Sequence, residues 1–356
     1  MKSLSIIIPT YNMESLLPRC LESLVAARHA ETLDVLVVND GSKDNSSYIG
    51  HEYEDKFPNL IKVIDKSNGN YGSTINAGLL EAKGKYVKIL DSDDWFDTDA
   101  LDKLLEYLQN IDTDVMVTHF TQIGSSDVKE VVRYNTMGYE PYIYGKVYDL
   151  DNVLEDGYIR FFLMHSLTYK TDLLREIKYK QTEGISYTDT EWAAIPIFHA
   201  KTICFLNLNV YQYNLDREGQ TMDPNVLLKS IPQLEKVNDR LIQYYIANRD
   251  RLSQIRAAFM KQFYENRIRI LYKTYLLDMP REKFCAEEFL SFDERQSKVC
   301  QLLGLNPKLY PENKILRVEY ISYWHKYHKR WPVWLEKINH WLDIVIKWVY
   351  IKLFRS

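Results

Sequence analysis

Cysteine is scarce in this chain of 356 residues, which contains four. Cys20, Cys204, Cys285 and Cys300 show neither close pairing nor the spacing of a metal site, which argues against a disulfide framework and against zinc ligation. Isolated cysteines of this kind are typical of buried thiols in a reducing compartment. We therefore expect a cytoplasmic protein.

Long apolar runs are also missing. No uninterrupted apolar stretch reaches the roughly 20 residues that a membrane-spanning helix needs. The apolar segment 4–8 is too short for the core of a signal peptide, and no cleavage site follows it. A formal net charge of -4 provides no general attraction to nucleic acid. We expect neither a transmembrane segment nor a nucleic-acid partner.

Apolar residues are plentiful, at 46% of the chain, so a substantial core can form, and the length allows two domains. Short apolar runs alternate with helical patterns over about the first 220 residues. This alternation predicts an α/β fold with a largely parallel sheet and helices on both faces. The expected strands are 4–8, 34–38, 61–64, 86–90, 114–118, 167–170, 202–206 and 210–213, and the expected helices include 14–27, 100–108, 171–177 and one that ends at Ala200.

The character of the sequence changes further along the chain. Residues 122–148 form short polar and aromatic segments, which indicate a β-hairpin excursion or a loop on the acceptor side. Glycine and proline almost disappear from about residue 226 to 277, which favours long helices. We place a domain boundary near Asp223 and Pro224, giving an α/β domain at 1–222 and a mostly helical domain at 223–356.

Three carboxylates follow the expected strand 86–90, namely Asp91, Asp93 and Asp94. Carboxylates this close repel one another and need a cation or a water-filled site. Hard oxygen ligands suit Mg²⁺ or Mn²⁺. The alternative is an acidic turn that starts the next helix. Polar turns also follow strands 4–8 and 34–38, and the ends of parallel strands share one edge of a sheet, so their convergence favours a ligand site.

Five short segments together resemble the family 2 glycosyltransferases, which are inverting enzymes with the GT-A fold. They are 5–12 (SIIIPTYN), 37–42 (VVNDGS), 76–78 (NAG), 84–86 (GKY) and 90–94 (LDSDD), and their order and spacing agree with the family. The resemblance covers roughly the first 220 residues. It implies a GT-A domain, with a Rossmann-like mixed and mainly parallel sheet, that moves a sugar from a nucleotide-sugar, usually a UDP-sugar.

The same resemblance implies the cofactor, the acceptor and the setting. The cofactor is Mn²⁺ or Mg²⁺, which neutralises charge on the diphosphate leaving group. The acceptor is a saccharide or a polyprenyl-linked saccharide, as in the bacterial capsule and exopolysaccharide glycosyltransferases that the chain resembles. The sequence lacks the Gln-x-x-Arg-Trp motif of processive relatives, which favours the addition of a single sugar.

The resemblance also assigns residues to the donor site. Asp93 is the main metal contact, Asp91 lies at the metal and the ribose or sugar, and Asp94 supports them. Asp40 hydrogen-bonds the nucleotide base, although an Asx-turn with Gly41 and Ser42 would need no ligand. The remaining donor contacts implied by the resemblance are Pro9, Thr10, Tyr11, Glu14, Asn70, Ser92 and Arg217, of which Arg217 could equally be a surface arginine at a domain junction.

Three places depart from the family pattern, and one of them is the glycine-rich turn at residues 69–72, which is a variant form. Many relatives have arginine immediately before Asn76, where this chain has Ile75. The general base of the family follows another acid, where this chain has Thr188 and then Asp189. We expect Asp189 to take the proton of the acceptor hydroxyl, with Glu191 as the second candidate. The alternative is that Asp189 only caps the helix that follows.

Two other functions stay open at this point. A nucleotidyltransferase can share an alternating α/β sheet and a pair of metal-binding carboxylates, but it normally has a glycine-rich loop with Lys or Arg after the first strand, which residues 9–12 lack. A non-catalytic nucleotide-sugar-binding protein could retain the fold without the reaction. The intact Asp40, Asp91, Asp93 and Asp189 argue against it.

The end of the chain, 331–356, is expected to form one helix that begins near Pro332. Basic residues dominate around it, and such an amphipathic helix suits the surface of an anionic membrane, as on the inner face of the plasma membrane. Alternatively, the helix packs on the catalytic domain or joins a homodimer. Its apolar stripe consists of Trp334, Ile338, Trp341, Leu342, Val345, Trp348 and Val349.

Overall fold

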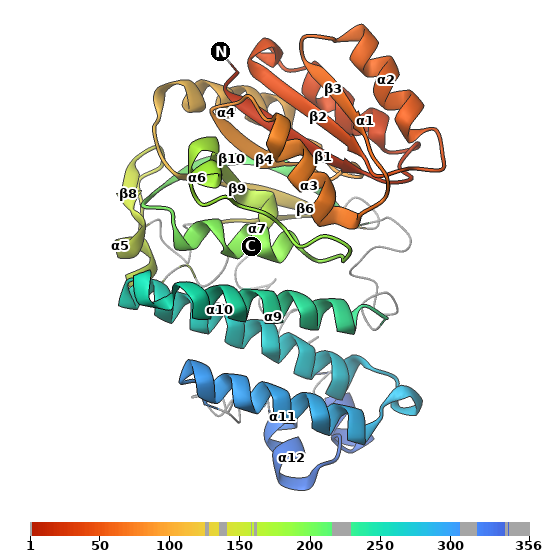
Figure 1. Cartoon of the computed structure of the whole chain (residues 1–356), viewed down its shortest axis with the longest axis vertical. Helices are drawn as coiled ribbons and strands as arrows, with labels where there is room; N and C mark the ends of the chain where they lie inside the picture. Colours follow the sequence, from red (N-terminus) through yellow and green to blue (C-terminus); the bar gives the residue numbers. More distant parts are fainter. Residues whose placement is uncertain are drawn as a thin grey trace. The chain divides into compact units, whose positions relative to one another are not determined.

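The computed structural model describes residues 2–124, 128–134, 141–157, 159, 162–215, 229–306, 319–338 and 341. The chain divides into two compact units (Figure 1). The first contains Met1–Val226 and Pro232–Met260, and the second contains Leu227–Ile231 and Lys261–Ser356. The first unit therefore includes a helix that begins after the predicted boundary at 222/223, and that boundary stays a prediction.

One mixed sheet forms the centre of the first unit, with the strand order β3-β2-β1-β4-β9-β6-β10-β5. The half from β3 to β4 is parallel throughout, as predicted. Beyond β4 the sheet is mixed, because β9 runs antiparallel to both of its neighbours, β4 and β6. The main strands are β1 (Leu4–Thr10), β2 (Leu33–Asn39), β3 (Ile61–Asp65), β4 (Tyr86–Ile89), β6 (Val115–Gly124), β9 (Leu167–Lys170) and β10 (Thr202–Asn214).

Three short strands extend the mixed half. β5 (Trp95–Phe96) and β8 (Val147–Asp149) pair antiparallel with β10, and β7 (Val128–Val132) pairs antiparallel with β6. The pairing of β7 with β6 agrees with the predicted hairpin excursion after residue 122. The α/β fold class is therefore confirmed, with antiparallel strands added on one side of a parallel half.

The helices between the strands follow from the apolar pattern. All seven residues of β1 and of β2 are buried, and α1 (Leu17–Val25) buries Leu17, Cys20, Leu21 and Leu24 on one side. Helix α1 is shorter than the predicted 14–27, because a proline lies in its first turn, where helices commonly begin. The other helices on this half are α2 (Ser46–Lys56), α3 (Asn70–Glu81) and α4 (Thr98–Asn110).

Two predicted elements need correction. The expected strands 202–206 and 210–213 are one strand, β10, whose pairing with β6 shifts register around Asn209 and thereby produces the apparent gap. The helix expected to reach Ala200 is α7 (Asp189–Ala194), followed by a 3-10 turn at Pro196–Phe198. Proline has no amide hydrogen to donate, so the α-helix ends before it. Two short helices, α5 (Leu150–Glu155) and α6 (Thr171–Glu176), precede α7.

The predicted helical C-terminal region is confirmed. It contains α9 (Ile231–Asn248), α10 (Gln254–Lys273), α11 (Ala286–Leu303) and α12 (Glu319–Tyr327). In the second unit a buried carboxylate, Asp293, accepts hydrogen bonds from the hydroxyl of Tyr272 and, at 3.0 Å, from the indole N–H of Trp324. These bonds join α10, α11 and α12.

The expected terminal helix is described only in part. Residues 333–338 are helical, while residues 339, 340 and 342–356 of the predicted helix lie outside the described residues. Within the described ranges, no helix has both the length and the hydrophobicity to cross a membrane.

Candidate active site

Three strands bring their polar ends to one edge of the sheet. Thr10 pairs with Asn39 across β1 and β2, and the amide of Asp40 donates to the carbonyl of Thr10 at 2.9 Å. On the other side of β1, the amide of Leu90 donates to the carbonyl of Ile7 at 3.0 Å. The turns after β1, β2 and β4 therefore meet at one edge, as their sequence pattern predicted.

The carboxylates after β4 form the centre of this edge. One oxygen each from Asp91, Asp93 and Asp94 lies within 4.8 Å of the others. Asp94 is buried, with hydrogen bonds from the Tyr211 hydroxyl to Oδ2 at 2.6 Å and from the Asn214 amide to Oδ1 at 2.7 Å. Burial, together with the nearby charges of Asp93 and Asp91, raises the pKa of Asp94 well above its ordinary value.

The other two acids are half-buried rather than buried. The hydroxyl of Tyr71, at the start of α3, donates to Oδ1 of Asp91 at 2.8 Å. Arg19 donates to the backbone carbonyl of Asp93 at 3.1 Å, with its guanidinium 3.7 Å from the centre of the Trp95 ring. Three carboxylates with two of them partly accessible fit the oxygen donor set that Mg²⁺ and Mn²⁺ prefer.

The predicted contacts from the first strand lie around this cluster. The buried hydroxyl of Ser92 donates to the carbonyl of Pro9 at 2.8 Å and so joins the acidic turn to β1. Thr10 is buried, whereas Tyr11 is exposed. The carboxylate of Glu14 accepts from the amide and the side chain of Asn45, both at 2.9 Å, at the start of α2. Their contacts with a donor stay predictions.

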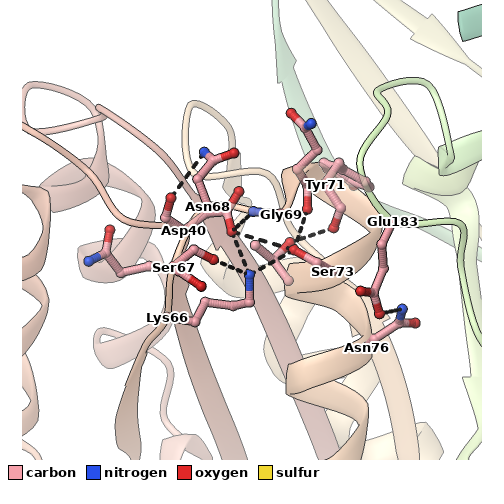
Figure 2. A network of polar contacts seen from close by, with 12 residues as sticks. Asp40, Lys66, Ser67, Asn68, Gly69, Tyr71, Ser73, Asn76 and Glu183 are labelled. Carbon is pink, nitrogen blue, oxygen red and sulfur yellow. Dashed lines mark hydrogen bonds and ion pairs between the residues drawn. The ribbon is translucent and has the colours of Figure 1, made fainter.

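Asp40 is held by the turn that follows β3 (Figure 2). Its Oδ1 accepts from Lys66 Nζ at 2.8 Å and from the Gly69 amide at 3.0 Å, and the Ser73 hydroxyl lies 3.4 Å away. The turn bond considered for Asp40 belongs instead to Asn39, whose Oδ1 accepts from the Ser42 amide at 3.1 Å. The Asp40 carboxylate is therefore directed toward residues 66–70, here called the donor loop because the family resemblance assigns Asn70 to the donor site.

A loop at residues 181–184, here called the strap, joins that donor loop to α7. The side chain of Asn76 accepts from the Gln181 amide and donates to the Gln181 carbonyl, both at 2.9 Å. It also donates to Glu183 (Figure 2). The amide of Gly184 donates to the Gly69 carbonyl at 2.9 Å. A Cβ on Gly72 would lie 2.0 Å from the carbonyl oxygen of Thr182, so only glycine fits at this position.

The strap also contacts α7, the helix that carries both candidate general bases, Asp189 and Glu191. Glu191 is fully buried, and its carboxylate accepts from the Thr182 amide at 2.9 Å. Burial raises the pKa of Glu191. Asp189, the first residue of α7, is half-buried, and its charge contributes to the raised pKa of Tyr71 after burial and Asp91. Asp189 is thus the more accessible of the two acids and lies near the hydroxyl that contacts Asp91.

Thr188 occupies the cap position of α7 and makes no capping bond with its side chain. Its hydroxyl donates to the Gln181 side chain at 3.1 Å.

Arg217, another predicted donor contact, lies outside the described residues. Asn70 begins α3 with a φ of 64°, next to Gly69.

Sequence reasoning missed two tyrosines and a lysine. Tyr71 and Tyr211 donate to Asp91 and Asp94, and no motif marks either tyrosine. Lys88 is fully buried within β4, where its ammonium donates to the carbonyls of His165 at 2.8 Å and Leu167 at 3.1 Å. Burial lowers the pKa of Lys88 to about 7. A lysine in the middle of an apolar strand is the one signal that could have indicated it.

Comparison with known proteins places this geometry in a family. Residues 5–177 match the family described as Glycosyl transferase family 2. This part of the chain is a glycosyl transferase family 2 domain. The family 2 domain thus contains Asp40 and the Asp91–Asp94 turn, whereas Asp189 lies beyond the matched residues.

Two curated relatives extend the comparison. "Glycosyltransferase GlyA" of Streptococcus pneumoniae is 27% identical over 219 residues, which are 61% of this chain and 31% of GlyA. The "Poly(ribitol-phosphate) beta-glucosyltransferase" of Bacillus spizizenii is 26% identical over 296 residues, which are 82% of this chain and 43% of that protein. The chain therefore spans less than half the length of these two relatives.

A solved structure supports the fold. The crystal structure of S. aureus TarS 1–349, in complex with UDP-GlcNAc, aligns with a TM-score of 0.61 at 19% identity, covering 92% of this chain and 88% of the TarS chain. The likeness confirms that the chain has a GT-A fold, which contains the family 2 domain, followed by a helical region.

Proposed function

We propose that the chain is an inverting, metal-dependent glycosyltransferase that moves one sugar from a UDP-sugar to a saccharide or lipid-linked saccharide of a cell-surface polysaccharide. The observation that carries the proposal is the shared sheet edge, where Asp40 and the Asp91–Asp94 turn flank β1. The complex of TarS with UDP-GlcNAc supports a uridine donor. The glucosyltransferase of B. spizizenii supports a polysaccharide acceptor.

Each proposed site residue has a separate role in the displacement of the diphosphate by the acceptor hydroxyl. Asp91 and Asp93 would hold a divalent cation, which would neutralise charge on the diphosphate leaving group. Asp40 accepts a hydrogen bond from the base, and Asp189 accepts the proton of the acceptor hydroxyl. The hydroxyl oxygen attacks the anomeric carbon as the bond to the diphosphate breaks, which inverts that carbon.

Donor hydrolysis is the direct test. The purified chain is incubated with a panel of UDP-, GDP- and dTDP-sugars, with Mn²⁺, with Mg²⁺ or with a chelator, and nucleotide release is measured. We expect release from a UDP-sugar that stops with the chelator. Binding of UDP without release from any donor would instead support a non-catalytic nucleotide-sugar-binding protein. A nucleotidyltransferase would release pyrophosphate from a nucleoside triphosphate in a parallel reaction with sugar phosphate.

We further propose that the terminal segment binds an anionic membrane and brings the enzyme to a lipid-linked acceptor. Trp334 and Trp341 are 62% and 61% exposed, and Ile338 is exposed nearby. Charge complementarity favours a lipid surface, since the lysines in this region outnumber its acids. Arg330 is not one of the solvent-facing cations near this segment, because its side chain is 5% exposed and donates to the carbonyls of Leu277 and Met279.

Point variants of the full chain test membrane binding better than truncation would. Ending the chain near Lys329 would also remove Trp331, which is buried against Tyr320. Co-sedimentation with anionic and with neutral vesicles should fall for a Trp334→Ser, Trp341→Ser double variant. The matched control is Leu80→Ser, which removes an 88% exposed apolar side chain from the first unit. Equal sedimentation of variant and wild type would contradict membrane binding, and a shift of a dimer to a monomer would indicate a subunit interface.

A further inference from the structure

One lysine lies beside Asp40, the expected contact of the nucleotide base, and its ammonium is bound by the protein rather than by solvent. Lys66 Nζ contacts Asp40 Oδ1 at 2.8 Å, the Ser67 carbonyl at 2.6 Å and the Ser73 hydroxyl at 2.8 Å (Figure 2). An ammonium has three hydrogens to donate, and all three have an acceptor here. The side chain of Lys66 is 23% exposed and that of Asp40 is 4% exposed.

A second lysine on the same segment provides the contrast. Lys62, within β3, forms an ion pair with Glu81 at 2.7 Å, and both side chains are more than 40% exposed. A surface pair of this kind contributes little to stability or geometry. Lys66 instead binds three groups, from the turns after β2 and β3 and from the first turn of α3, so its position is fixed by the structure around it.

The contacts of Lys66 make the two oxygens of Asp40 unequal. Lys66 and Gly69 both donate to Oδ1, whereas the Ser73 hydroxyl, whose one hydrogen lies closer to the Asn70 carbonyl at 2.7 Å, is 3.4 Å from Oδ1. Within the part of the chain that the structure describes, no residue donates to Oδ2, and Oδ2 is not among the fully buried atoms that lack a partner. With one oxygen fixed by the Lys66 ammonium and the Gly69 amide, the carboxylate cannot rotate freely, and the second oxygen is left for a ligand.

On the basis of the proposed function, we propose that Lys66 is a specificity-determining residue, which fixes Asp40 so that its second oxygen selects uracil over cytosine. A carboxylate only accepts hydrogen bonds. Uracil has an N–H at ring position 3, whereas cytosine has a bare nitrogen acceptor there, which would face the carboxylate oxygen. Selection thus depends on Asp40 keeping one orientation, and Lys66 keeps it there. Ile75 is buried and apolar, so it adds no charge near this turn.

Calorimetric titration with UDP and with CDP tests the role of Lys66. The proteins are the full-length wild type, Lys66→Met, Lys66→Gln and the control Lys62→Met, all with the same concentration of Mn²⁺. We expect Lys66→Met to weaken UDP binding by about 10- to 100-fold, the effect of losing a charged hydrogen bond. The dissociation constant for CDP divided by that for UDP should fall toward one in Lys66→Met. Lys66→Gln should give an intermediate value because its side chain keeps a neutral donor.

The outcomes separate the two proposals. If the wild type binds UDP and Lys66→Met binds it equally well with the same ratio to CDP, the role of Lys66 is wrong while the proposed function stands. If the wild type binds neither nucleotide, the uridine donor and the role of Lys66 both fail. Thermal unfolding of each variant shows whether it folds. If Lys66→Met does not fold, the UDP and CDP affinities of Lys66→Gln test the role of Lys66. Lys62→Met should match the wild type throughout.

Discussion

The two halves of the central sheet hold their site residues in different ways. In the half from β3 to β4, the acids follow the ends of parallel strands, and the pairing of β2 and β4 with β1 places Asp40 and Asp91 on either side of β1. In the other half, Asp189 begins a six-residue helix that is tied to the donor loop by the strap. The comparison teaches that strand order places the backbone of the donor-site acids, whose carboxylates are then oriented by side chains such as Lys66, whereas contacts between distant segments hold the helix that carries Asp189.

The largest expected effect lies in the half set by strand ends. We expect Asp93→Ala to abolish sugar transfer, because the acidic turn then loses a metal ligand. Without metal the variant should be as stable as the wild type or more so, since one of three repelling charges is removed. Transfer assays with Mn²⁺ and thermal unfolding in chelator measure the two effects. Wild-type turnover by Asp93→Ala with metal present would show that the metal site is assigned wrongly.

Asp189→Asn tests the other half. The amide has the same shape as the carboxylate but cannot take the acceptor proton, so we expect transfer to fall by about 10²- to 10⁴-fold. Binding of UDP, measured by calorimetry, should stay within a few-fold of the wild type. A parallel loss of UDP binding and turnover would instead point to a structural role of Asp189 at the start of α7.

These two predictions rest on residues that the sequence could indicate. Strand-end acids are visible because an apolar run stops at a carboxylate, and parallel strands must end together. The supporting residues are not visible in this way, because Tyr211 reaches Asp94 across 117 positions and Asn76 reaches Gln181 across 105. Such pairs depend on where β9, α7 and β10 lie in the fold. The shifted register of β10 was likewise hidden, since its irregular centre resembles a loop.

Tyr71→Phe tests the link between the two halves. The tyrosine hydroxyl donates to Asp91 and lies within reach of the charge of Asp189. We expect a loss of about tenfold in kcat/KM, the effect of one hydrogen bond to a charged group. The concentration of Mn²⁺ that gives half-maximal activity should rise, because Asp91 loses its fixed orientation. Tyr107→Phe, on the exposed surface of α4, is the control, and equal metal dependence in both variants would contradict the role of Tyr71.

Lys88→Met should have the smallest effect, on stability alone. The ordinary lysine pKa of 10.5 falls to about 7 in the folded chain because of burial. Between these values the unfolded lysine binds a proton that the folded lysine does not, so the free energy of unfolding rises with pH. That rise is at most about 1.4 kcal/mol per pH unit and is absent in Lys88→Met. The free energy of unfolding of the two proteins is measured with urea at pH 7, 8 and 9. If it changes with pH equally in both, Lys88 is not the source of the pH dependence.

The position of β9 has a consequence for how the protein is made. β9 lies between β4 and β6, although β6 precedes β9 in the chain. As the ribosome delivers the chain from its N-terminus, the parallel half can assemble once β4 emerges. The open edge of β4 then waits for about 80 further residues, or several seconds of synthesis at typical rates. During that interval β4 presents unpaired backbone groups that can pair with another nascent chain. A fragment that ends before Leu167 keeps this edge open permanently, so aggregation of such fragments during expression is the expected result.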